Sequence, residues 1–404
     1  MALRNDPVSP SSAIPAAASP GPMATPRRVL EGVLGIPATE GNSIEVLRNG
    51  DEIFPAMLSA IAAARHTVDF LTFIYWSGEV GQRFADALCE RAAAGVRVRL
   101  LVDAVGSRLM DDDLLDQLTA SDCELRQFRP LARLRPWEVN HRTHRKVVVI
   151  DEEVAFTGGV GIADNWKGNA ASPDEWRDTH FRLQGPAVDG LRAAFLDNWL
   201  ETGSDLFDER IDRFPQQEQR GKSVVQVVRG AAETGLSDIS TLLRTLIRLA
   251  ERRIRFTTAY FVPDDDLVEL LCDARSKGVE VQILLPGPHT DKRFVQVAGE
   301  TQYGRLVECG VEIWAYQPTM LHAKIVTVDG ELCSVGSANL NRRSSAYDEE
   351  VNLVVFDRGL TTTLDDHFDE DLRVSKRVTK WSWERRSRSQ RALEGMSRVF
   401  RPMS

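Results

Sequence analysis

Histidine and lysine stand two residues apart at two places in the chain, as His144 with Lys146 and as His322 with Lys324. Each lysine is followed, after four residues, by an aspartate, and each aspartate, after six more, by a glycine. A single His-x-Lys pair arises by chance in many proteins, whereas two copies that agree at every fixed position indicate one chemical motif used twice. The remaining fixed positions are Asp151 and Gly158 in the first copy, and Asp329 and Gly336 in the second.

These residue types suit an anion that carries a reacting centre. Lysine is a cation without an acceptor at neutral pH, so it makes a poor metal ligand, whereas imidazole can attack or transfer protons. A short β-branched run follows each lysine, fully apolar at 147–150 and with one Thr at 325–328, as in a buried strand. Because residues two apart in a strand share a face, each His and Lys should project together. We predict a site for phosphate chemistry that uses no metal and no cofactor.

Expected strands and helices alternate along the chain, which predicts an α/β sandwich fold. Gly95 and Gly278 both precede strands that begin Val-x-Val, and they lie 278 − 95 = 183 residues apart. The two motif histidines lie 322 − 144 = 178 residues apart. The near-constant offset indicates an internal duplication. We expect two pseudo-symmetric lobes, with the two motifs facing each other across their interface.

Composition sets the expected domain boundaries. Residues 1–42 are rich in Ala, Pro, Ser and Gly and are expected to be disordered. Residues 43–205 should form the first lobe and 223–371 the second, joined by a polar linker at 206–222. Residues 372–404 form a basic tail, with ten Arg or Lys against two Glu.

The overall composition, 43% hydrophobic and 27% charged, is that of an ordinary soluble globular protein. No apolar run approaches the roughly 18 residues that span a membrane, and the N-terminal stretch lacks the apolar core of a signal peptide. The net charge of −9 argues against a dedicated nucleic-acid binder. The five cysteines have no metal-binding spacing, so we expect buried thiols of a reducing compartment and no disulfide.

The doubled motif resembles that of the phospholipase D superfamily, and the flanking sequence resembles its bacterial cardiolipin synthase branch, in the short form without transmembrane helices. The resemblance covers roughly residues 43–404. The stretches that carry it, besides the motifs, are FIYWSGEVG at 73–81, GVRVRLLVD at 95–103, WRDTHFRLQGPAV at 176–188, TAYFVPD at 258–264 and GSANLNRRS at 336–344.

The resemblance implies that one histidine attacks the phosphorus of a phosphodiester while the other protonates the departing oxygen. An alcohol or water then resolves a covalent phosphohistidine. By analogy with the family we assign His144 as the nucleophile and His322 as the general acid, although nothing in this sequence decides the order. Lys146 and Lys324 would hold the non-bridging phosphate oxygens.

The resemblance also implies phosphate-binding residues after each glycine. Asn339 matches an amide donor of the family, and Ser337 can add a hydroxyl. The first copy departs from the pattern, because Gly159 and Gly161 stand at the matching positions. Either backbone N–H groups replace the side chains there, or the phosphate is bound unevenly by the two halves.

Four acidic residues have expected roles. Asp178 and Glu350 match the carboxylates that orient the two histidines in the family. Asp151 and Asp329 follow the two motif strands and are expected to be structural acids in turns or salt bridges.

Two basic segments could touch lipid. The loop 129–138 interleaves arginine with leucine and tryptophan, and the tail 372–404 carries aromatic residues among its cations. Each could instead pack on the protein. Tyr75 and Tyr260 occupy similar places at strand ends and could line the mouth of the site or pack in the core.

The resemblance predicts a cytoplasmic enzyme, peripherally bound to the cell membrane, that transfers a phosphatidyl group between two phosphatidylglycerol molecules to give cardiolipin and glycerol. Its partners would be anionic phospholipid and the membrane surface, with no nucleic acid. The first alternative is the same chemistry with water or another alcohol, as in a phospholipase D, a transphosphatidylase or a nuclease-type phosphodiesterase. The second is a non-catalytic lipid-binding module, which two complete His/Lys sets disfavour.

Overall fold

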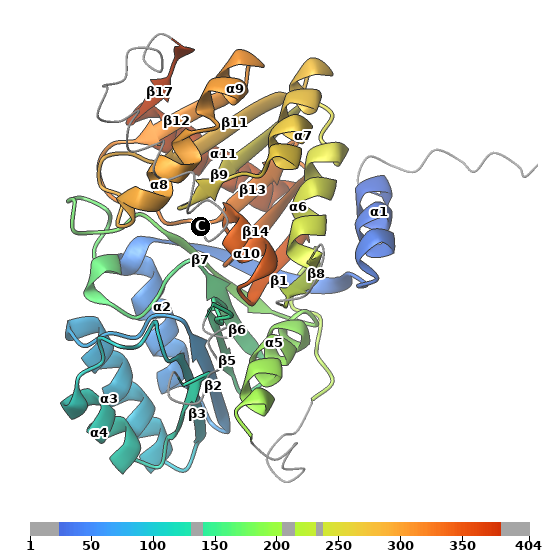
Figure 1. The fold of residues 1–404 in the computed structure, drawn as a ribbon. Coiled ribbons are helices and arrows are strands. Elements are labelled where there is room, and N and C mark those ends of the chain that lie inside the picture. Colours follow the sequence, from blue (N-terminus) through green and yellow to red (C-terminus); the bar gives the residue numbers. More distant parts are fainter. Residues whose placement is uncertain (1–23, 131–139, 204–214, 232–236, 381–404) are drawn as a thin grey trace, which may run out of the picture.

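One sheet of 15 strands runs through two lobes of the molecule (Figure 1). The computed structural model describes residues 24–130, 140–203, 215–231 and 237–380. In Figure 1 the first lobe is the lower one, coloured blue to green, and the second is the upper one, coloured yellow to red. The strand order is β17-β12-β11-β9-β13-β14-β16-β8-β1-β7-β6-β5-β2-β3-β4, so the lobes join where β1 pairs with β8.

The first lobe is a sheet with helices on both faces. Its strands are β1 (Thr39–Arg48), β7 (Thr179–Gln184), β6 (Val154–Gly158), β5 (Val147–Ile150), β2 (Thr67–Thr72), β3 (Arg97–Asp103) and β4 (Glu124–Phe128). One face carries α2 (Asn49–Ala62), α3 (Glu79–Ala93) and α4 (Asp112–Ala120), and the other carries α5 (Val188–Glu201) (Figure 1).

The second lobe repeats this order. Its strands are β8 (Ser223–Gly230), β16 (Glu350–Phe356), β14 (Leu332–Gly336), β13 (Ile325–Val328), β9 (Arg253–Thr257), β11 (Glu280–Pro286) and β12 (Glu312–Tyr316). Its helices are α6 (Asp238–Leu249), α7 (Asp265–Ser276) and α9 (Tyr303–Glu308) on one face, and α11 (Arg358–Arg373) on the other. Smaller elements are η2 (Asp164–Trp166), β10 (Phe261–Val262), α8 (Arg293–Glu300), β15 (Leu340–Asn341) and α10 (Arg342–Ala346).

The two lobes are related by a pseudo-two-fold. Read outward from the β1–β8 pair, strands β1-β7-β6-β5-β2-β3-β4 correspond one by one to β8-β16-β14-β13-β9-β11-β12. Each motif strand, β5 or β13, forms an antiparallel hairpin with the strand that follows it. The predicted fold class, two pseudo-symmetric α/β lobes, is therefore confirmed. The lobe boundary at 206–222 stays a prediction, since residues 204–214 lie outside the described part of the chain.

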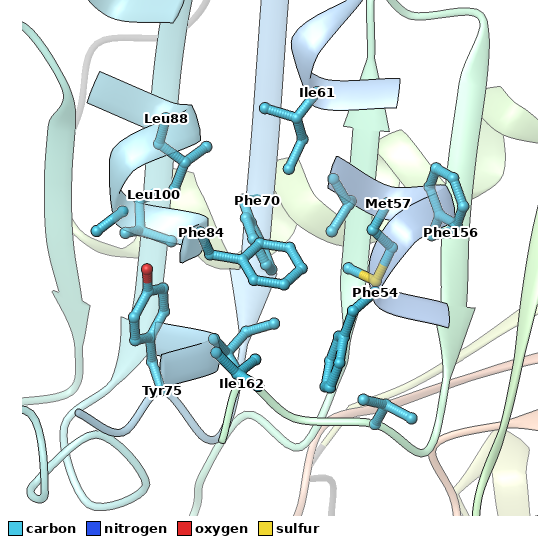
Figure 2. Close-up of a cluster of buried hydrophobic side chains, with 14 of the residues drawn as sticks. Phe54, Met57, Ile61, Phe70, Tyr75, Phe84, Leu88, Leu100, Phe156 and Ile162 are labelled. Atoms are coloured by element: carbon cyan, nitrogen blue, oxygen red, sulfur yellow. The ribbon is translucent and has the colours of Figure 1, made fainter. Parts of the chain in front are cut away.

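The core of the first lobe lies between the sheet and helices α2 and α3 (Figure 2). Apolar residues at helical spacing, such as Phe84 and Leu88 of α3, are fully buried against Phe70 and Leu100 of the sheet. Tyr75 belongs to this cluster: it is fully buried and its hydroxyl donates to the Gly81 carbonyl at 3.0 Å. Of the two interpretations left open for Tyr75, core packing is the correct one.

The expected disorder of residues 1–42 is wrong for residues 24–42. Residues Ala24–Leu34 form helix α1 beside α6, and Leu30 is fully buried in the core of the second lobe (Figure 1). Residues from Thr39 onward belong to β1 at the centre of the sheet. Composition misses this segment because a few apolar residues on one helix face suffice for docking. Residues 1–23 lie outside the described part.

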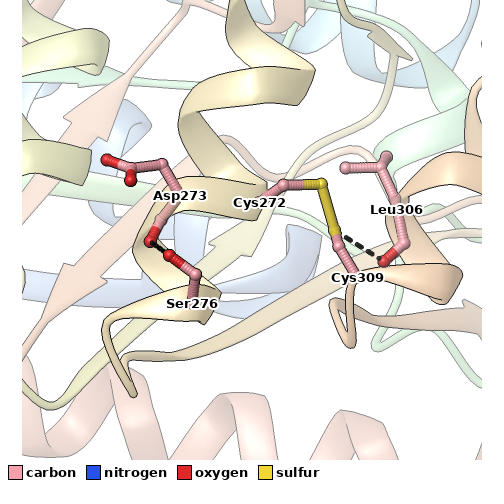
Figure 3. Close-up of a disulfide and its surroundings, with 5 residues drawn as sticks. All are labelled: Cys272, Asp273, Ser276, Leu306 and Cys309. Carbon is pink, nitrogen blue, oxygen red and sulfur yellow. Dashed lines mark hydrogen bonds between the residues drawn. A yellow bond between two sulfur atoms is a disulfide. The ribbon is translucent and has the colours of Figure 1, made fainter.

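The expectation that no cysteine forms a disulfide is also wrong. Cys272 in α7 is bonded to Cys309, the residue after α9, with their Cα atoms 5.5 Å apart (Figure 3). The spacing of 37 residues carries no sequence signal. The two cysteines meet only because α7 and α9 pack on the same face of the sheet. The expectation of a reducing compartment rested on the absence of disulfides, so it no longer has that support. Cys89, Cys123 and Cys333 are free thiols.

The basic tail begins inside the fold. Residues Ser375–Val378 form β17, which pairs with β12 and extends the sheet of the second lobe. Residues 381–404 of the basic tail lie outside the described part, as do residues 131–139 of the basic loop, so the expected lipid contact of both segments stays a prediction. None of the helices within the described ranges has the length and apolar character to cross a membrane.

Candidate active site

Short backbone bridges between the lobes bring the two motifs together. The His144 N–H donates to the Glu349 carbonyl at 2.8 Å, so the chain before β5 runs beside the chain before β16. In the pseudo-symmetric position, the His322 N–H donates to the Arg177 carbonyl at 2.7 Å, beside the start of β7. Each histidine is thereby held against the chain of the other lobe that carries an acidic residue at the start of a strand, Glu350 as the first residue of β16 and Asp178 just before β7.

Each histidine is oriented by a carboxylate of the opposite lobe. His144 Nδ1 lies 3.0 Å from both carboxylate oxygens of Glu350, and His322 Nδ1 lies 2.8 Å from Oδ2 of Asp178. All four side chains are buried, with His144 only 9% and His322 only 4% exposed. A carboxylate on Nδ1 favours the tautomer that carries its proton there, which leaves Nε2 available for chemistry.

Burial dominates the protonation of the histidines. It lowers the pKa of His144 to about 3 and that of His322 to about 4, against the opposing effect of the carboxylates. Burial acts the other way on the carboxylates, but hydrogen bonds and the nearby positive charges hold the pKa of Glu350 and of Asp178 at about 2. In the free protein both histidines are therefore neutral and both carboxylates ionised at pH 7.

The two lysines project on the same side as their histidines, as the strand spacing predicts. Lys146 Nζ donates to the His144 carbonyl at 2.7 Å, and Lys324 Nζ lies 3.2 Å from His322 Nε2. Both lysines are 3% exposed. Burial lowers the pKa of Lys146 to about 8 and that of Lys324 to about 7, and the carboxylates limit the fall. Each lysine is thus buried beside the histidine of its own motif.

A buried donor supports each carboxylate. The Ser337 hydroxyl donates to Glu350 and accepts the Val351 N–H. In the other half the indole N–H of Trp166 donates to Oδ2 of Asp178 at 2.9 Å. Because Ser337 is fully buried behind the His144–Glu350 pair, we now assign its hydroxyl a positioning role in place of the expected contact with phosphate.

The two glycines of the first copy have packing reasons. A Cβ on Gly159 would lie 2.3 Å from Oδ1 of Asp178, so the carboxylate occupies the place that the Ser337 side chain takes in the other half. A Cβ on Gly161 would lie 2.8 Å from Ile74. The Gly159 N–H is also used, since it donates to the Thr179 carbonyl at 3.3 Å. These contacts favour packing over phosphate binding for both glycines.

A pocket of about 490 Å³ lies between the lobes and contains both histidines and Lys146. Its walls are largely apolar and aromatic, with cations at the edge. Trp176 lines the pocket with its ring centroid 5.4 Å from that of His322, and Phe73 lines it at 5.3 Å from the His144 ring. Trp166 is buried beside His322, with its ring centroid 5.2 Å from the His322 ring, and is not among the lining residues. The other lining residues are Ile74, Trp76, Val105, Gly106, Arg108, Leu109, Asn165, Tyr260, Asp291 and Lys292.

A second, more polar pocket of about 280 Å³ shares His144, Phe73, Val105, Tyr260 and Lys292 with the first. The predicted phosphate ligand Asn339 lines this pocket. Arg343 and Asp348 line it too, and they form an ion pair at 2.9 Å. Burial raises the pKa of Asp348 to about 7. Ser337, Gly159 and Gly161 are not among the residues that line either pocket.

Asp151 and Asp329 tie the motif strands to the sheet. Asp151 accepts the backbone N–H groups of residues 65–67 at 2.7–3.2 Å. Asp329 accepts those of residues 251–253 at 2.7–2.9 Å. Both hold the start of the neighbouring strand and lie at the opposite end of the motif strand from its histidine, which supports the structural role expected for them.

The structure brings together the two His/Lys pairs, which residue type and spacing grouped, and the carboxylates Asp178 and Glu350, which the family resemblance added; Asn339 lies beside them. It adds residues that the sequence did not reveal. Trp166 and Lys292 follow no spacing rule, and their place at the site depends on how loops of the two lobes meet. Tyr260 lines both pockets, so of its two interpretations the pocket-lining one holds.

Comparisons with known proteins agree with this geometry. A family model described as "Cardiolipin synthase, PLD-like domain" matches residues 57–174 and 243–372, which is once in each lobe. Cardiolipin synthase 1 of Bacillus cereus is 32% identical over 378 residues, covering 91% of this chain and 74% of that protein. The cardiolipin synthase of Geobacillus thermodenitrificans is 34% identical over 371 residues, covering 91% and 73%.

Solved structures share the fold at low sequence identity. The phosphatidylserine synthase of Haemophilus influenzae has a TM-score of 0.73 and 15% identity, with 94% of this chain and 100% of that chain covered. The polyphosphate kinase of Porphyromonas gingivalis has a TM-score of 0.57 and 13% identity, with 90% and 54% covered. The family match and the identities over nine-tenths of the chain decide the relationship: the chain belongs to the cardiolipin synthase family, phosphatidyltransferases of the phospholipase D superfamily.

Proposed function

We propose that the protein transfers a phosphatidyl group from one phosphatidylglycerol to another, which gives cardiolipin and free glycerol. The observation that carries the proposal is the pair of cross-lobe His–carboxylate contacts on one pocket, His144 with Glu350 and His322 with Asp178. Membership of the cardiolipin synthase family supports the choice of lipid. The largely apolar pocket and the net charge of −9 favour a lipid over a nucleic acid.

The first step forms a covalent intermediate. Nε2 of neutral His144 attacks the phosphorus of the donor lipid, and the bond from phosphorus to the glycerol headgroup oxygen breaks. His322 gives its Nε2 proton to that oxygen, so glycerol leaves as a neutral alcohol. Negative charge on the non-bridging oxygens is stabilised by Lys146 and Lys324.

The second step reverses the roles. A hydroxyl of the acceptor phosphatidylglycerol attacks the phosphohistidine and gives its proton to His322, and the phosphorus–nitrogen bond to His144 breaks. Every proton and bond is then accounted for, and the enzyme is regenerated. His322 must carry a proton on Nε2 as well as on Nδ1 in the first step, although burial lowers its pKa to about 4 in the free protein. The negative charge of a bound phosphodiester raises that pKa.

Product analysis tests the proposal. Full-length protein is incubated with phosphatidylglycerol vesicles in EDTA, and lipids and glycerol are quantified by mass spectrometry. We expect cardiolipin and glycerol in equal amounts, with turnover unaffected by the chelator because the lysines supply the positive charge. Phosphatidic acid without cardiolipin would reassign the protein to the hydrolases, and faster cleavage of single-stranded DNA than of lipid would reassign it to the nuclease-type enzymes.

A further inference from the structure

Two exposed apolar side chains belong to the segments that form the catalytic pocket. Among the described residues, Leu109 is 55% and Phe294 is 49% exposed, and few other large apolar side chains are as accessible. Leu109 lines the larger pocket from the connection between β3 and α4 in the first lobe. Phe294 lies at the start of α8 in the second lobe, between Lys292 and Val295, which both line the smaller pocket. Each lobe thus has one exposed apolar residue in the pocket lining or next to it in the chain, and we call this region the rim.

Charged residues flank both apolar side chains. Arg108 precedes Leu109, and Lys292 and Arg293 precede Phe294; all three cations are exposed, and Arg108 and Lys292 line the larger pocket. Exposed acids also lie nearby, at Asp291 and at positions 111–113. The rim is therefore mixed in charge, and a basic patch alone would not describe it.

The proposed substrate requires the pocket mouth to lie at a membrane, and this step rests on the proposed function. Moving each CH₂ group of a lipid chain out of the bilayer costs about fourfold in partitioning. Complete extraction of two acyl chains is prohibitive. A pocket of about 490 Å³ is of the size that holds a drug-sized group, so only the headgroup region needs to enter while the chains stay in the bilayer.

We propose that the rim formed by Arg108, Leu109, Lys292, Arg293 and Phe294 docks on the surface of a bilayer that contains anionic phospholipid. Leu109 and Phe294 insert among the acyl chains at the headgroup boundary, one from each lobe. The three cations then lie at the level of the lipid phosphates. Docking on this rim places the pocket mouth over a headgroup without extraction of the lipid.

Vesicle flotation of the full chain tests the surface. The rim variant is Leu109→Ser with Phe294→Ser. The matched control is Val33→Ser with Val374→Ser, which changes side chains that are 53% and 47% exposed, on α1 and after α11. Phosphatidylglycerol–phosphatidylcholine vesicles serve as the probe, at low and at high salt. We expect the rim variant to lose at least about tenfold in partitioning, with the control unchanged and wild-type binding largely retained at high salt.

Several outcomes would overturn the docking surface. The first is a rim variant that floats with the vesicles as wild type does, and the second is a control variant that loses as much vesicle binding as the rim variant. The third is wild-type vesicle binding that disappears at high salt, as expected if a basic segment alone binds the membrane. Thermal unfolding of each variant checks that the fold is intact, and a second rim variant, Phe294→Ala alone, replaces the first if that one fails to fold. Because flotation needs no turnover, the docking surface and the proposed reaction can fail separately.

Discussion

At the scale of single residues, the site depends on each histidine receiving its carboxylate from the other lobe. Burial alone would leave two neutral imidazoles free to rotate. Glu350 and Asp178 fix the orientation of His144 and His322, and Ser337 and Trp166 hold the carboxylates in turn. That each histidine and its lysine project on the same side could be predicted from their spacing in the sequence. The equivalence of a serine hydroxyl and an indole N–H could not, because it exists only in three dimensions.

Replacing the proposed nucleophile should abolish turnover. His144→Ala removes the group that forms the covalent bond, and we expect glycerol release to fall at least about 10³-fold. His141→Ala is the matched control, because His141 lies three residues earlier and contacts Tyr347 outside the pocket. Glycerol release near the wild-type rate in the His144 variant would remove it from the mechanism.

The lysines predict the alkaline limb of the pH profile. The pKa of Lys324 is lowered to about 7 and that of Lys146 to about 8, so each is charged below its pKa and neutral above it. As pH rises through 7 and 8, the free enzyme loses positive charge from the phosphate site, and kcat/KM should fall. Lys324→Arg stays charged, so its limb should move to higher pH. A limb at the same pH in this variant would contradict the assignment.

Ser337 offers a test of positioning. Ser337→Ala leaves Glu350 with one donor fewer, and we expect kcat to fall about tenfold with KM little changed, since the hydroxyl does not line the pocket. The acidic limb of the kcat profile should also shift, because the charge on Glu350 affects the pKa of His144. Ser344→Ala, at a serine that lines the smaller pocket, is the comparison. A rise in KM without loss of kcat for Ser337→Ala would indicate phosphate binding instead.

At the scale of elements, the extended segment that leads into β5 positions chemistry on one side and holds the lobes together on the other. Arg145 lies between His144 and Lys146 and is 2% exposed. Its guanidinium donates to three backbone carbonyls, those of Ala194 in α5, Gly230 in β8 and Glu350 in β16. The alternation of a strand thus gives His144 and Lys146 to the pocket and Arg145 to the lobe junction.

Removing Arg145 should destabilise the whole fold. Arg145→Met removes one donor from each of three buried carbonyls and a buried cation from beside Glu349, so we expect a loss of roughly 3–5 kcal/mol in the free energy of unfolding. Arg229→Met is the matched control, because Arg229 pairs with Asp197 at the surface, where such a pair contributes about 0–1 kcal/mol. Denaturant unfolding measures both. Equal, small losses in the two variants would contradict the role of Arg145.

Elements with a strong local pattern were predictable, and those that depend on distant partners were not. The strand at 147–150 and the strand that follows Gly95 lie close to where the sequence places them. Helix α1 was missed, because its stability comes from docking on α6 across about two hundred residues of chain. The Cys272–Cys309 disulfide was missed for the same reason, since α7 and α9 meet only in the folded lobe.

At the scale of the whole molecule, duplication explains both the symmetry and the chemistry. A single lobe contains a histidine without the carboxylate that orients it, so the site is complete only when two lobes join at the β1–β8 pair. The pseudo-two-fold also brings two similar histidines to one pocket. Differences between the halves, Glu350 with Ser337 against Asp178 with Trp166, then allow the two histidines to take different roles.

The central claim is that one histidine of this cross-lobe pair carries the phosphatidyl group. The direct measurement is to mix the enzyme with labelled phosphatidylglycerol, quench within one turnover in base, where phosphohistidine survives, and map the label by mass spectrometry. We predict a phosphatidyl adduct on the peptide that contains His144, and none in His144→Ala. An adduct on His322 would exchange the two roles, whereas cardiolipin formation with no adduct on either histidine would contradict the covalent mechanism.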